Sequence, residues 1–94
     1  MRVLLKAQID AETGTRAIQD GTMRRVIAKI SETATPEAAY FGPQDGKRTM
    51  MLFLDLEDSS LIPRVTEPLF AELNAELEIL PVMNQEEMAR GMAS

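Results

Sequence analysis

The sequence contains one cation and two carboxylates that could act together on a substrate. Lys6 lies in an alternating run near the N-terminus, Asp55 ends a second such run, and Glu78 lies in a third. A lysine between two carboxylates can stabilise an enolate or bind a carboxylate, with Asp55 or Glu78 as the base. The hydroxyl of Tyr40, the only tyrosine, could donate a hydrogen bond to a ligand carbonyl. These four residues are the candidate catalytic residues.

The same residues also have a structural interpretation. Buried charges are normally paired, so Lys6 between Asp55 and Glu78 would form a cross-strand ion pair at an interface. Tyr40 would then be an amphipathic aromatic residue packed at the rim. Both interpretations require the three charged residues to lie on neighbouring strands.

Two absent residue types exclude several kinds of chemistry. The chain has no Cys and no His, which removes thiol catalysis, disulfides and the commonest general base and metal ligand. Ser59 and Ser60 therefore have no His to activate them, and they are better interpreted as helix caps. We expect no metal site and no cofactor.

Length and charge limit the partners. We expect the 94 residues to form a single domain (1–94), whose small core would gain from pairing with a second copy. The net charge of -5 opposes binding to nucleic acid and to anionic lipid. No apolar run approaches the roughly 18 residues that a membrane span needs. We therefore expect a cytoplasmic protein, with a homodimer favoured.

Periodicity predicts alternating strands and helices with a C-terminal tail. Asp45-Gly46 is a strong two-residue hairpin signal, and it would place Tyr40 opposite Met51. Pro68 should kink or divide its helix, and Pro81 favours an edge strand. The predicted elements are a strand over 2–9, helices over 11–19 and 23–30 with Thr22 as the cap of the second, two hairpin strands within 36–58, a helix over 58–73, a strand over 76–82, and a docked tail helix over 84–94.

This order predicts an α+β, ferredoxin-like βαββαβ domain with a four-stranded antiparallel sheet in the order 4, 1, 3, 2 and its helices on one face. The other face would be too apolar for water and too polar for a dry core. A second copy facing it would cover the apolar side chains and leave the polar ones around a small cavity. The candidate ligand-binding residues on this face are Lys6, Gln8, Tyr40, Met51, Phe53, Asp55 and Glu78.

On its element order and two-faced sheet, the chain resembles the dimeric α+β barrel superfamily, and within it the small uncharacterised bacterial members. The resemblance implies a homodimeric barrel that binds a small, largely apolar metabolite, with cofactor-free isomerisation or oxidation as the activity. Haem-degrading members usually rely on a His, which this chain lacks.

Two alternatives share the same element order. A non-enzymatic ACT-like ligand-sensing or assembly module needs no catalytic residues, so the sequence leaves open whether the protein is an enzyme. An RNA-binding module would stack bases on exposed aromatics of the first and third strands, where only Phe53 is available, on an acidic protein.

Overall fold

Strict alternation along the first strand sorts its side chains onto two faces of a sheet. In the computed structural model, which describes residues 1–93, β1 (Arg2–Ile9) buries every second residue from Val3 onward. The intervening residues are only partly covered. β1 is thus a central strand with one core face and one partly exposed face.

Three further strands complete an antiparallel sheet: β2 (Ala38–Gln44), β3 (Lys47–Asp55) and β4 (Glu76–Pro81). The strand order is β2-β3-β1-β4, which is 4, 1, 3, 2 when counted from the other edge. Pro81 is the last residue of the edge strand β4. At this position the sheet needs no hydrogen bond from its backbone nitrogen, so a proline is tolerated.

The hairpin has the predicted register. Tyr40 pairs with Met51 and Ala38 pairs with Phe53. Asp45 and Gly46 both have a left-handed backbone, with φ of 55° and 73°, as the tight two-residue hairpin turn requires. The predicted register is therefore confirmed, and β3 buries Met50, Leu52 and Leu54 on one face as expected. On β2 the predicted core face is not buried, since Phe41 is 62% exposed.

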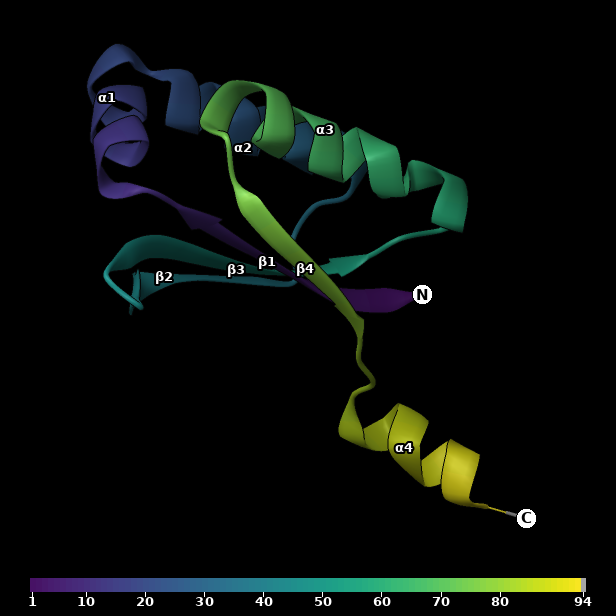
Figure 1. Cartoon of the computed structure of the whole chain (residues 1–94). Coiled ribbons are helices and arrows are strands. Elements are labelled where there is room, and N and C mark those ends of the chain that lie inside the picture. The colour runs from purple at the N-terminus through teal and green to yellow at the C-terminus, as the bar shows by residue number, and fades with distance from the viewer. Residues whose placement is uncertain (94) are drawn as a thin grey trace.

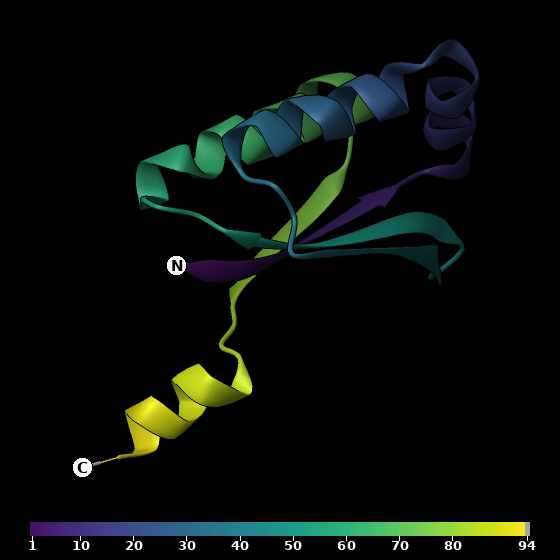
Figure 2. The ribbon, with the colours of Figure 1, turned by 180° about the vertical axis from the view of Figure 1, so that it is seen from behind.

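Three helices cover the core face of the sheet: α1 (Ala11–Asp20), α2 (Thr22–Thr33) and α3 (Ile62–Leu73) (Figures 1 and 2). The predicted break at Gly21 is confirmed, because its φ of 86° turns the chain between α1 and α2. Thr22 is the first residue of α2 and not its cap, and its backbone N–H is bound by Asp20 instead. The layer encloses the core, made of Val3, Leu5, Ala7, Ile9, Ala17, Val26, Ile30, Ala34, Met50, Leu52, Leu54, Leu56, Val65, Leu69, Leu73 and Ala75.

The start of α3 differs from the prediction. A 3-10 turn over Ser59–Leu61 precedes the helix. Asp58 caps this turn, and its carboxylate accepts a hydrogen bond of 2.9 Å from the N–H of Ser60. Leu61 occupies the N-cap position of α3 and makes no side-chain cap bond. The serines are therefore not the caps. Pro68 lies inside α3 without dividing it.

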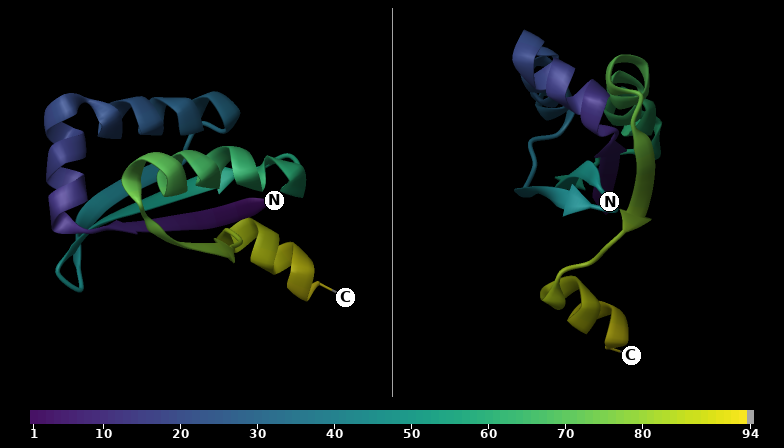
Figure 3. Two further views of the ribbon diagram at one scale, coloured as in Figure 1. Left: turned by 45° about the horizontal axis from the view of Figure 1, so that its top comes forward. Right: turned by 60° about the vertical axis from the view of Figure 1, so that its left-hand side comes forward.

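The tail helix exists but is not docked. α4 (Gln85–Met92) begins at the predicted cap, Asn84, which exchanges two hydrogen bonds with Glu87 in a capping box. No residue of α4 is buried, and the helix projects from the sheet on the side opposite the other helices (Figure 3). Of the predicted tail 84–94, Ser94 lies outside the described residues. None of the helices within residues 1–93 is long and apolar enough to cross a membrane.

Candidate functional site

The face of the sheet away from α1, α2 and α3 has a mixed surface, which we call the open face. Its side chains alternate with buried core residues on β1 and β3 and with the partly buried Leu77 and Ile79 on β4, and the register places residues of β2 beside them. Within the described chain no helix lies across it (Figures 1 and 2). The open face consists of Arg2, Leu4, Lys6, Gln8, Ala38, Tyr40, Gly42, Gln44, Lys47, Thr49, Met51, Phe53, Asp55, Glu76, Glu78 and Leu80. The ammonium group of Lys47 pairs with Glu76 at 2.8 Å.

All seven candidate residues lie on this face, but the structure does not bring Asp55 to Lys6. The register of β1 and β3 pairs Lys6 with Met51 and pairs Asp55 with Arg2. Four residues along a strand correspond to about 13 Å, so Asp55 lies beyond the reach of Lys6. Its carboxylate instead accepts a hydrogen bond of 3.2 Å from the amino group of Met1. The predicted Lys6–Asp55 pair is therefore wrong.

Glu78 does lie beside Lys6. The two residues are directly opposite each other on β4 and β1. Among the residues described, however, no carboxylate oxygen comes within 4.0 Å of the Lys6 ammonium group, and Glu78 is exposed. Together with Gln8 and Glu76, these residues line a small hollow of about 100 Å³ at the β4 edge.

Gln8 and Met51 have different surroundings. The amide of Gln8 donates to the carbonyl of Gln44 and to the Thr49 hydroxyl, at 3.2 and 3.4 Å, so it stabilises the hairpin end of the sheet. Met51 lies between Tyr40 and Lys6 in one cross-strand row. Met51 thereby separates the hollow beside Lys6 from the side chain of Tyr40.

A larger hollow of about 440 Å³ lies at the other end of the open face. Tyr40 and Phe53 form part of its wall, and the Tyr40 side chain is mostly exposed, at 61%. Its remaining lining residues are Arg2, Glu37, Ala38, Val82, Met83 and Asn84. Tyr40 and Lys6 therefore belong to two different depressions. The one beside Tyr40 has both apolar and charged walls, and the one beside Lys6 is mainly polar.

Arg2 is a residue of this end that the sequence did not single out. Its guanidinium bonds the carboxylate of Glu37 at 2.9 Å and also pairs with Glu87 at the start of α4. The hydrogen bond that Arg2 donates to Glu37 raises the pKa of Arg2 above its usual value. Its position on the open face followed from the alternation of β1, but its two partners come from distant segments that local patterns do not place.

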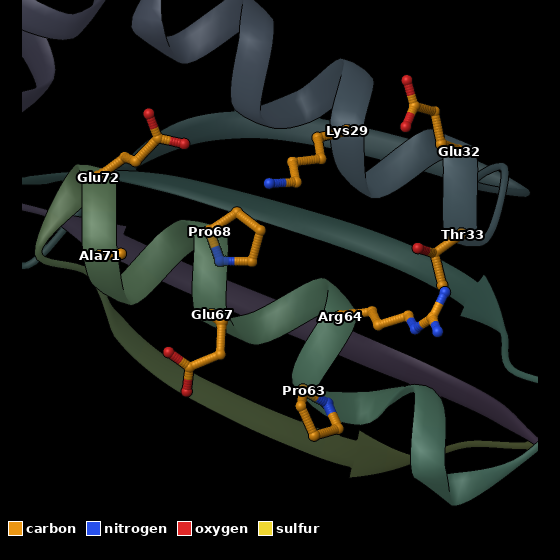
Figure 4. Close-up of a pocket in the computed structure, with 9 residues that line it drawn as sticks. All are labelled: Lys29, Glu32, Thr33, Pro63, Arg64, Glu67, Pro68, Ala71 and Glu72. Atoms are coloured by element: carbon orange, nitrogen blue, oxygen red, sulfur yellow. The ribbon is translucent and has the colours of Figure 1, made fainter.

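A third depression lies outside the sheet, in a surface groove of about 660 Å³ between α2 and α3 (Figure 4). Lys29 reaches into it from α2 and Arg64 reaches from α3 toward Thr33, while the carboxylates of Glu32 and Glu67 point away from the space between the helices. None of the sequence candidates lines it. Its mixed charges and open shape favour no single ligand class.

Comparison with known proteins adds no family. The chain matches no family model, no curated protein and no solved structure. Within the described residues no group of three or more acidic side chains could hold a metal ion.

Proposed function

We propose that the chain is a ferredoxin-like subunit of a homodimer in which two open faces pack against each other, as in a dimeric α+β barrel. The space between the sheets would bind a small, largely apolar molecule. Cofactor-free isomerisation or oxidation is the activity that such a site would support.

The observation that carries this proposal is the open face itself. Leu4, Met51 and Phe53 are only partly covered by their own chain, and Leu80 at the edge is 55% exposed. A contiguous apolar surface of this kind on a small protein usually marks an interface or a ligand site. A second sheet about 10 Å away would cover these side chains, as in two-layer sheet packing.

Lys6 gives the proposed site its chemistry. It is the cation at the centre of the open face, while Arg2 at one end is already paired with two carboxylates. An anionic group on an otherwise apolar ligand would bind Lys6, and Tyr40 would donate a hydrogen bond from the neighbouring hollow. Glu78 remains the candidate base, whereas Asp55 has lost its place beside Lys6.

The dimer is tested by light scattering after size exclusion at tens of micromolar protein. We expect twice the 10.4 kDa mass of one chain. Phe53→Glu should give a folded monomer, because it buries a charge between the sheets. Phe70→Glu is the matched control, since Phe70 is 48% exposed on α3, and it should remain dimeric. A wild-type monomer would sink the proposal.

The ligand is tested by titrating the dimer with benzoate and cinnamate, using their neutral amides as controls. Only the carboxylates should bind, and Lys6→Met should weaken that binding at least tenfold with little change in the melting temperature. Stabilisation by a free amino acid, with no response to these acids, would instead favour the ACT-like module.

A further inference from the structure

The C-terminal segment 82–92, which we call the arm, is bonded to β1 at its base and has an exposed tip. The N–H of Val82 donates to the carbonyl of Arg2 at 3.0 Å, which continues the pairing beyond β4. Glu87 then pairs with Arg2 and also accepts a hydrogen bond of 2.9 Å from the N–H of Asn84. One carboxylate therefore fixes both the start of α4 and its attachment to β1.

The tip carries an apolar stripe that its own chain does not cover. Met88 and Met92, one turn apart on α4, are 51% and 81% exposed. An isolated helix of eight residues is marginal in water, since helices shorter than roughly 12–15 residues depend on packing for their stability. A preformed cap and a fixed base on such a short helix indicate that its packing partner is another molecule.

The direction of the arm identifies that molecule. α4 lies on the open side of the sheet in every view, opposite the three other helices (Figures 1, 2 and 3). A second sheet would lie about 10 Å below the first. Because α4 is about 12 Å long, the arm spans the level at which that second sheet would lie.

Exchanged arms would also enlarge the contact between the two copies. A stable interface usually buries about 800 Å² of accessible surface on each partner. The exposed methionines of two arms would add to the surface that the facing sheets bury.

We infer that the arm docks on a second copy of this chain, with Met88 and Met92 packed against the rim of the partner's open face. This inference rests on the proposed dimer. By two-fold symmetry each subunit both gives and receives an arm, so the arms close the two ends of the space between the sheets.

The test compares two double substitutions on opposite sides of α4. Met88→Gln with Met92→Gln keeps side-chain length and helix propensity but removes the apolar stripe. Glu86→Gln with Arg90→Gln introduces the same two residues on the other side and is the matched control. Sedimentation should show at least a tenfold weaker dimer for the methionine variant and no loss for the control.

Cross-linking supplies the second readout. The chain has no Cys, so Met88→Cys gives a unique site for a photoreactive cross-linker. Mixed dimers of isotopically labelled and unlabelled chains should yield links between chains to residues of the open face. Cross-links only within one chain, or a dimer whose affinity does not change in the methionine variant, would contradict docking of the arm on a second copy. Neither result would contradict the proposed dimer of facing sheets. A monomeric wild-type protein would contradict both the dimer and the docking of the arm. A dimer that is weakened by the substitutions at Met88 and Met92 but not by Phe53→Glu would support docking of the arm and contradict the facing sheets.

Discussion

At the scale of single residues, three aspartates hold helix starts and turns through their charge. Hydrogen bonds from the side chain and backbone of Thr13 lower the pKa of Asp10, and those from Thr22 lower the pKa of Asp20 in the same way. The backbone and side chain of Ser60 lower the pKa of Asp58. In each case the folded chain binds the proton less readily than the unfolded chain.

These shifts predict how stability depends on pH. A lowered folded pKa gives stability that is present above the unfolded value of roughly 3.9 and is lost as pH falls through the folded value. Replacing all three aspartates by Asn keeps the caps but removes the titration, so urea unfolding below pH 4 should show a shallower loss of stability than in the wild type. The corresponding Ala triple loses the caps, and it should be less stable at pH 7 as well. If the variant with three Asn residues lost stability below pH 4 as steeply as the wild type, the three aspartates would not be the source of the acid dependence.

At the scale of elements, the β2–β3 hairpin depends on its turn. Gly46 has a φ of 73°, and a side chain added there would meet no atom within 4 Å, so only backbone strain opposes substitution. Gly42, in the same hairpin, has equally open space and no such strained φ. The two glycines form a natural pair for separating strain from packing.

Gly46→Ala should lower the free energy of unfolding by about 1–2 kcal/mol, the usual cost of a left-handed backbone for a residue with a Cβ. Gly42→Ala should leave it unchanged or raise it slightly, because Ala loses less conformational freedom on folding. Urea denaturation of both variants measures the difference. Equal effects would contradict the expected backbone strain of a residue with a Cβ at position 46.

Local patterns predicted the elements whose partners are close in the sequence. The Asp45-Gly46 turn fixes the hairpin register, and the Asn84 capping box fixes the start of α4. The predicted Lys6–Asp55 pair was wrong because β1 and β3 are not joined by a tight turn that would set their register. The alternation correctly placed both residues on the same face, but it could not show which residues of the two strands lie opposite each other. The docked tail failed because an apolar stripe shows that a helix needs a partner without showing which surface provides it.

At the scale of the whole molecule, the sheet separates a closed core from the open face. Leu52 is 1% exposed beneath the helices, while Leu80 is 55% exposed on the other side. Both are leucines on strands of one sheet, so their environments differ mainly in what covers them.

Leu52→Ala should cost about 2–5 kcal/mol in unfolding free energy, because it leaves a cavity in the core. Leu80→Ala should cost less than about 0.5 kcal/mol when measured in dilute, dissociated protein. If the proposed dimer forms, the same Leu80 variant should show a smaller rise of melting temperature with protein concentration than the wild type, because it removes part of the proposed interface. A large effect of Leu80→Ala in the dilute protein would mean that the open face is part of the core of one chain.

The edge prolines restrict how this protein can associate with itself. Pro43 lies in β2 and Pro81 ends β4, so both outer strands of the sheet carry a residue that cannot donate a backbone hydrogen bond. Such residues discourage the strand-by-strand addition of further chains that leads to fibrils. These edge prolines thereby oppose open-ended growth of copies of this chain along the edges of the sheet.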